Sequence, residues 1–288
     1  MTTVAQSLDT PAPQAQSQPS IQVGDFTVTA LTDGFFELPP PFLMKDGEPL
    51  RDGPESVHLE INAFLVTTAD RTLLVDTGCG PLLGPTVNHL ADSLARSGKA
   101  LSDIDAVLCT HIHPDHTNGL IDASGMARFP NAQIFVHQNE IDFWMSDEQR
   151  SKAPEALRIQ FEWARQAFEP YAGRVWPFER GEILQGIEAV PLFGHTPGHS
   201  GFQFDGGGNN QLLIWGDIVH AMELQVRDPD VTVVADLDPE MARSSRRAIF
   251  DRVASDDILF AGMHVGFPGF GRLARGGTGY EYGAIGSG

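Results

Sequence analysis

The sequence feature that most constrains this chain is a cluster of metal-binding residue types at positions 111–116. The segment reads His-Ile-His-Pro-Asp-His, so three histidines and one aspartate occupy six positions. It directly follows an apolar run, residues 106–109, which predicts a short buried parallel strand. Open α/β sheets place their sites at the carboxyl ends of such strands. The cluster therefore indicates an α/β fold with a functional site at one end of a sheet.

The chemistry of these residues points to transition metals. Imidazole and carboxylate together suit zinc, or manganese, iron or cobalt, better than calcium or magnesium. The alternation of His111 and His113 directs two side chains the same way, while Asp115 and His116 turn off the strand end toward a second position. The chain has 10 histidines, so chance could place three together. Four potential ligands in this order nevertheless favour metal binding. Their number would allow them to contribute to two metal positions.

The same arrangement recurs elsewhere in the chain, because single polar residues follow other predicted strands. Apolar runs at residues 72–75, 186–192, 212–215 and 258–261 each predict a strand. The residues offered just after these runs are Asp76, His199, Asp217 and His264. We therefore expect all of these side chains to converge with the 111–116 cluster on one rim of the fold.

Composition limits the partners of such a site. A net charge of -19 and a pI of about 4.7 argue against nucleic acid, which demands a basic surface, and against anionic membranes. No run approaches the roughly 18 apolar residues that span a bilayer. A neutral substrate, or one attracted by the charge of the metal, fits better. Cys79 and Cys109 are expected to be buried free thiols, which favours the cytoplasm, although a removed leader would allow the periplasm.

Length and patterning predict the organisation of the chain. Residues 1–20 are rich in Gln, Ser, Pro and Thr and are expected to be a disordered tail, with a single domain over residues 21–288. A chain of 288 residues could also form two small domains. Two halves of strands followed by helices would place two sheets face to face between helical layers. The apolar, proline-rich segment 35–50 either packs on the core or forms a pocket wall.

The motifs resemble those of the metallo-β-lactamase superfamily. The matching residues are Asp76, the 111–116 cluster, His199, Asp217 and His264, and the resemblance spans residues 24–283. It implies a four-layer αββα sandwich with two metals at one edge of the sheets. Zinc is the favoured metal, with manganese, cobalt or iron as alternatives.

The resemblance also assigns a role to each matching residue. It implies that His111, His113 and His199 hold one metal, that Asp115, His116 and His264 hold the other, and that Asp217 bridges them. Asp76 and His195 would not bind the metals themselves but would orient the residues that do. Two metals in such a site hold a bridging hydroxide that attacks a carbonyl carbon. The residues expected to take part in catalysis are Asp115, Asp217 and His220.

Local matches such as Gly24-Asp25-Phe26, Asp142-Phe143-Trp144 and Phe267-Pro268-Gly269 are most similar to the methyl parathion hydrolase branch and its lactonase and aryl-esterase relatives. At two pocket positions the chain departs from the organophosphate enzymes. Leu43 stands where those enzymes are expected to carry an arginine. His220 stands where they are expected to carry a leucine, and acyl-homoserine lactonases carry a tyrosine there. His220 could also be merely a packed strand-end histidine. The residues expected to line the substrate pocket are Leu43, Leu83, Trp144, Phe161, His220 and Ala235.

The favoured function is hydrolysis of lactones and aryl esters, with hydrolysis of organophosphate triesters as a side reaction. The alternatives are a main organophosphate hydrolase activity of the methyl parathion type and an acyl-homoserine lactone quorum-quenching lactonase. A non-hydrolytic metal-binding or redox member of the fold is the alternative outside the hydrolases. Analogy with the nearest branch and the apolar 35–44 loop together predict a homodimer.

Overall fold

The computed structural model describes residues 18–286. The predicted disordered tail, residues 1–20, therefore lies almost wholly outside the described residues, and the first strand begins at Ser20. None of the helices in residues 18–286 has both the length and the apolar character needed to cross a membrane.

Two seven-stranded sheets form the centre of the molecule. The first contains, in spatial order, β1 (Ser20–Val23), β2 (Phe26–Leu38), β5 (Val57–Thr67), β6 (Thr72–Val75), β7 (Ala106–Leu108), β8 (Gln133–His137) and β9 (Val175–Phe178). The second contains β10 (Gly181–Leu184), β11 (Ile187–Pro191), β12 (Ser200–Asp205), β13 (Gln211–Ile214), β15 (Leu259–Ala261), β16 (Phe270–Gly276) and β17 (Gly279–Ile285). A small third sheet joins β14 (Thr232–Val233), β3 (Leu43–Lys45) and β4 (Glu48–Pro49).

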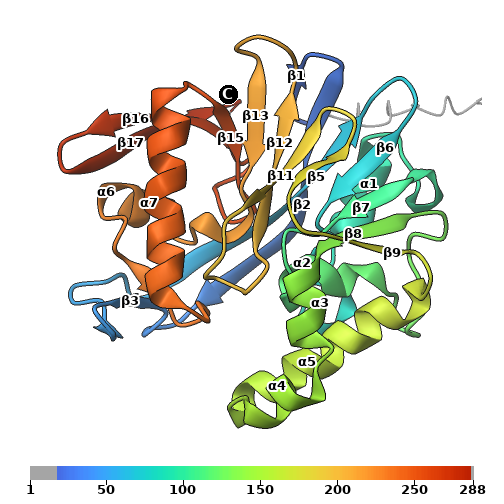
Figure 1. Cartoon of the computed structure of the whole chain (residues 1–288), viewed down its shortest axis with the longest axis horizontal. Helices are drawn as coiled ribbons and strands as arrows, with labels where there is room; N and C mark the ends of the chain where they lie inside the picture. The colour runs from blue at the N-terminus through green and yellow to red at the C-terminus, as the bar shows by residue number, and fades with distance from the viewer. Residues whose placement is uncertain (1–17, 287–288) are drawn as a thin grey trace, which may run out of the picture.

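Helices cover the outer faces of both sheets, as Figure 1 shows. The first sheet carries α1 (Leu90–Arg96), α2 (Pro114–Thr117), α3 (Gln138–Trp144) and α5 (Glu155–Phe168), with α4 (Asp147–Lys152) packed at the ends of α3 and α5, and the second carries α6 (Met222–Arg227) and α7 (Pro239–Ser255). Apolar side chains from both sheets, among them Val28, Phe64, Phe202 and Ile214, form one buried cluster between them. The four layers confirm the predicted αββα sandwich.

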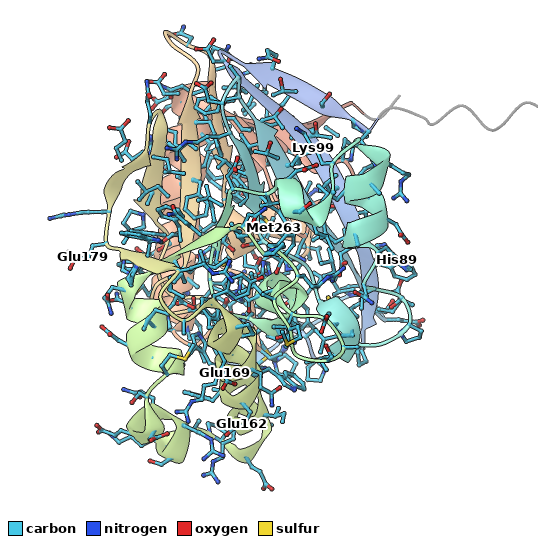
Figure 2. The ribbon with its side chains drawn as sticks, turned by 90° about the vertical axis from the view of Figure 1, so that its right-hand side faces the viewer. His89, Lys99, Glu162, Glu169, Glu179 and Met263 are labelled. Atoms are coloured by element: carbon cyan, nitrogen blue, oxygen red, sulfur yellow. The ribbon has the colours of Figure 1, made fainter. Side chains whose placement is uncertain are left out.

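The pairing of the strands brings the predicted strand ends to one edge. Strands β6, β7 and β8 are parallel, so their carboxyl ends lie side by side. In the second sheet β13 and β15 are also parallel. The loops after these strands therefore meet at one edge of the sandwich. Met263, labelled near the centre of the molecule in Figure 2, is fully buried just before His264.

Two segments differ from what their residue types favour. Thr32-Asp33-Gly34 is typical of a turn, but β2 continues through a bulge there, because the buried carboxylate of Asp33 accepts backbone N–H groups of Cys79, Asn88 and Leu90. The spacing of Val87, Leu90 and Leu94 favours a helix from residue 85, but α1 begins only at Leu90, since Asn88 has a φ of 73°.

Two helices follow their sequence signals closely. The sequence of helix α5 carries an apolar stripe with helical spacing, and this stripe is buried at Phe161, Ala164 and Phe168. Helix α7 starts at a capping signal, with the Asp238 side chain accepting the N–H of Met241 and proline at the first helical position.

Candidate metal centre

The loop after β7 brings the first ligands together through an acidic residue on the neighbouring strand. Asp76, at the end of β6, accepts the N–H and the hydroxyl of Thr110 at 2.8 and 2.7 Å. Its Oδ2 also lies 2.7 Å from Nδ1 of His116. This contact leaves Nε2 of His116 facing the site, which is how carboxylates commonly orient histidine ligands. The structure thus places Asp76 where a ligand-orienting residue was expected.

A first group of ligand atoms comes from His111, His113, His195 and Asp217. The Nε2 atom of His111 lies 3.0 Å from Nδ1 of His113, and that atom lies 2.9 Å from Nε2 of His195. Nδ1 of His195 faces the buried carboxylate of Asp236 at 2.8 Å, so its Nε2 is directed at the group.

In the described part of the chain, His195 lies among these grouped ligand atoms and His199 does not, so the assignment of His199 as a ligand stays a prediction. Both ring nitrogens of His199 are used by the backbone. Nδ1 lies 2.8 Å from the carbonyl oxygen of Leu192, and Nε2 accepts the N–H of Asp217 at 2.8 Å. His199 therefore supports the loop that carries Asp217. His195, which we expected only to orient ligands, points a free nitrogen into the site.

A second group consists of Asp115, His116 and His264. Oδ2 of Asp115 lies 3.5 Å from Nε2 of His116 and 3.6 Å from Nε2 of His264. The other ring nitrogen of His264 lies 2.7 Å from the carbonyl oxygen of Glu60. Asn62, on β5, holds the loop around His264 by binding the backbone of Met263 and Val265.

Asp217 lies between the two groups, as expected. Its Oδ2 lies 3.2 Å from Nε2 of His195 in the first group and 3.1 Å from Nε2 of His264 in the second. Its Oδ1 lies 3.3 Å from Nε2 of His116. The two oxygens of one carboxylate thus face ligand nitrogens of both groups, which is the arrangement that a bridging residue requires.

The charges in the cluster fit bound cations. Burial lowers the pKa of His111 and of His113 well below the ordinary value, so both rings are neutral and can donate a lone pair. Burial would raise the pKa of Asp217, but His116, His264 and His111 hold it well below the usual range. Two buried atoms here, Nε2 of His116 and Oδ1 of Asp217, lie 3.3 Å apart, but neither makes a hydrogen bond within residues 18–286. Buried polar atoms are normally partnered, so a metal ligated by these atoms explains their position.

His220 lies against both groups without belonging to the predicted ligand set. Its Nε2 is 3.1 Å from Oδ2 of Asp217, and its ring stacks on that of His264 with centroids 5.0 Å apart. Burial lowers the pKa of His220 to about 4, against the opposing effect of Asp217, so the ring is neutral at pH 7. Its Nδ1 is buried without a partner. Asp217, His220 and His264 could also hold an ion together.

A cavity of about 320 Å³ opens onto the metal-binding residue types. Leu83, His220 and Ala235 line it, as we expected of the substrate pocket. Part of the apolar 35–50 segment also contributes, so this segment forms a pocket wall as well as packing on the core. The remaining lining residues are Phe36, Leu38, Phe42, Leu59, His113, Pro114, Asp115, Gln160, Trp163, His195 and Asp217.

The other three expected pocket residues lie in the core instead. Trp144 and Phe161 are fully buried beneath the first sheet, and their rings contact each other with centroids 4.9 Å apart. The indole N–H of Trp144 donates to Oε2 of Glu140 at 3.0 Å. Leu43 packs against Val57 and Val233 in a separate cluster. Phe161 belongs to the apolar stripe of α5, and Leu43 belongs to β3. Both elements direct these side chains into the core rather than toward the cavity.

Several residues at the site were missed in the sequence. Trp163 and Gln160 lie three residues apart on the flank of α5, next to its buried stripe, and this flank faces the cavity. The helical periodicity of the sequence places these two residues beside the buried stripe. Periodicity alone does not say whether that flank faces solvent or a cavity. Asp236 follows strand β14 and could have been found as a strand-end carboxylate. The contact of Glu60 with His264 spans 204 positions and has no local signal.

Comparisons with known proteins agree with this geometry. Residues 58–264 match the family model of the metallo-beta-lactamase superfamily. The N-acyl homoserine lactonase AiiA of Bacillus thuringiensis subsp. kurstaki is 22% identical over 229 residues, which cover 73% of this chain and 83% of AiiA.

Two solved structures are similar over nearly the whole chain. Hydrolase AbOPH, described as in the beta lactamase superfamily, has a TM-score of 0.84 and 29% identity, covering 93% of this chain and 97% of that one. AidC, a dizinc quorum-quenching lactonase solved with the product N-hexanoyl-L-homoserine, has a TM-score of 0.83 and 24% identity, covering 92% and 96%. At that identity the second likeness concerns the fold. The match over most of the chain confirms the resemblance stated above: this chain belongs to the metallo-β-lactamase superfamily.

Proposed function

We propose that this protein is a dinuclear metal-dependent hydrolase of lactones and aryl esters, with hydrolysis of organophosphate triesters as a side reaction. The observation that carries the proposal is the position of two ligand groups, joined by Asp217, at the base of a largely apolar cavity. A hydrolytic centre needs ligands for the metals and a place for a substrate beside them.

Zinc is the metal we propose for both positions. His111, His113 and His195 would hold one ion, Asp115, His116 and His264 the other, and Asp217 would contact both. Nitrogen and carboxylate ligands of this kind are typical of zinc in proteins, and cobalt, manganese or iron would also be accepted. When bound, two such ions supply an activated water nucleophile and polarise the carbonyl oxygen of the substrate.

The protein side chains select and orient the substrate. The cavity wall is apolar at Phe36, Leu83 and Trp163, and the chain has a net charge of -19, so a neutral substrate is favoured over an anionic one. His220 lies on this wall beside Asp217. A ring N–H of His220 would donate a hydrogen bond to the leaving oxygen of an ester or lactone as the bond breaks.

A narrower candidate is hydrolysis of N-acyl homoserine lactones. AiiA and AidC are both named as lactonases of this kind, which favours a lactone substrate within the proposed class. A main phosphotriesterase activity is less favoured, because the His220 ring occupies part of the cavity. The other departure, Leu43 in place of an arginine, carries no weight, since Leu43 does not line this cavity.

The test is metal analysis of the purified protein combined with a panel of lactones, aryl esters and phosphotriesters. We expect close to two transition-metal ions per chain and the highest kcat/KM on lactones or aryl esters. A protein with two metals and no hydrolysis of any panel member would support the non-hydrolytic alternative. A kcat/KM highest for phosphotriesters would reverse the order of substrates proposed here.

We also propose a homodimer. Its support is an apolar groove beside β3, lined by residues such as Pro40, Phe42, Pro49 and Leu50. Sedimentation at micromolar concentration tests the proposal, and a purely monomeric protein would overturn it.

A further inference from the structure

A buried carboxylate outside both ligand groups connects the loops of the first group. Glu140 lies in the first turn of α3 and is fully buried. Burial raises the pKa of its carboxyl group. A buried acidic group is costly unless its oxygens are hydrogen-bonded, so its partners indicate what it is for.

Both oxygens of Glu140 bind loops that carry histidines of the first group. Oε2 accepts the N–H of Ile112 at 2.8 Å, and Ile112 lies between His111 and His113. Oε1 accepts the N–H of Gly198 at 2.7 Å, in the loop that begins with His195. A single carboxylate therefore spans the two loops that supply all three histidines of the first group.

Gly198 packs closely against Glu140 at this contact. A Cβ atom added to Gly198 would lie 2.8 Å from the backbone nitrogen of Glu140 and 2.9 Å from its Cγ. Trp144 adds a third hydrogen bond to the same carboxylate, at 3.0 Å, and its ring contacts that of His113 with centroids 5.6 Å apart. Glu140 thus holds the backbone of both loops directly, and it holds the Trp144 ring that packs against His113.

The second group is held by other residues. Asp76 orients His116, and the carbonyl oxygen of Glu60 orients His264. None of the hydrogen bonds that Glu140 makes reaches Asp115, His116 or His264. Asp76 also reaches the first group, because it accepts the hydroxyl of Thr110, whose Oγ1 lies 3.0 Å from Nδ1 of His111. Glu140, in contrast, supports the first group alone.

We propose that Glu140 is a positioning residue that sets the geometry of the His111–His113–His195 position alone. The inference rests on the proposed two-metal centre and adds that the two positions can be emptied independently. Replacement of outer residues that orient ligands typically weakens metal binding by 10–100-fold. We expect Glu140→Gln to weaken zinc binding at one position by about that factor and to leave the other unchanged.

The experiment measures zinc content and thermal unfolding of the holoprotein after dialysis against chelators of increasing strength. The variants are Glu140→Gln and, as a matched control, Asp33→Asn. Asp33 is also a fully buried carboxylate that accepts three backbone N–H groups, but it holds β2 and the start of α1. We expect both variants to lose stability. Only Glu140→Gln should fall from about two zinc ions to about one at intermediate chelator strength.

Double variants identify which position is emptied. Glu140→Gln should add little to the zinc loss of His195→Ala, because both affect the same position, and should add fully to that of His264→Ala. Loss of both ions together, or the same zinc retention in Glu140→Gln as in Asp33→Asn, would reduce Glu140 to a general structural role. If Glu140→Gln does not fold, Glu140→Asp keeps the charge on a shorter side chain and gives the same test. A wild-type protein without two ions would instead overturn the proposed function.

Discussion

The ligand cluster and the cavity wall lie side by side, yet their residues are fixed by different parts of the fold. Each candidate ligand lies in the segment that follows a strand, in a loop or, for Asp115 and His116, in the short helix α2, and the pairing of the strands sets where that segment begins. The wall combines the end of β2, the loop before β3, a flank of α5 and single residues such as Leu83 and Ala235. The candidate ligands therefore depend on the pairing of the central strands, whereas the wall is assembled from several separate elements.

This comparison predicts where substitutions will act. Changes in the ligand cluster should remove metal and all activities together. Changes in the cavity wall should alter the preference among substrates while the metal content stays constant.

The largest effect is expected for Asp217→Ala. Asp217 faces both ligand groups, so its loss should cost metal at both positions and several kcal/mol of transition-state stabilisation, or about a 10³-fold lower kcat/KM. The fold should remain, because the carboxylate is not part of a core cluster. Metal analysis and circular dichroism check this. Full activity with one metal per chain would contradict the dinuclear centre.

His195 and His199 provide a matched pair within one loop. His195→Ala should lose one metal and reduce kcat/KM by about 10²-fold or more for every substrate, since it removes a ligand. His199→Ala should keep both metals but lose about 1–3 kcal/mol of stability, because two buried backbone partners become unpaired. Metal content after gel filtration distinguishes them. The opposite result would restore the assignment made from the sequence.

This pair of histidines also shows which features of the site can be predicted from the sequence and which cannot. Strand-end position and residue type were enough to predict the fold, the 111–116 cluster, Asp217 and His264 as parts of one site. They could not separate two histidines four residues apart in one glycine-rich loop, because the choice depends on which ring meets the backbone at Leu192. The Glu60 carbonyl was missed for a related reason, because its contact with His264 joins segments far apart in the chain, whereas the position of Asp236 shortly after β14 was a usable signal.

A smaller and more selective effect is expected for His220→Leu. His220 lies on the boundary between the two regions, since it contacts Asp217 and lines the cavity. Losing its hydrogen bond to the leaving oxygen should lower lactone and ester hydrolysis by about 10²-fold. Nitrophenyl phosphotriesters should be spared or improved, because their leaving group is already a weak base and leucine frees space. A parallel fall in both activities together with loss of metal would make His220 a ligand.

The smallest effect on activity, and the sharpest comparison, is expected for two tryptophans. Trp163 lines the cavity, so Trp163→Ala should raise KM for aryl esters by about 10-fold, as expected for roughly 1–2 kcal/mol of lost aromatic contact, and should change small aliphatic lactones little. Trp144 is fully buried, so Trp144→Ala should cost about 3–5 kcal/mol of stability and show no preference between substrates. Kinetics on paired substrates and urea unfolding measure both quantities. If Trp144→Ala instead discriminated between aryl and aliphatic substrates, the pocket would extend beneath α3, and the separation between wall and core would fail.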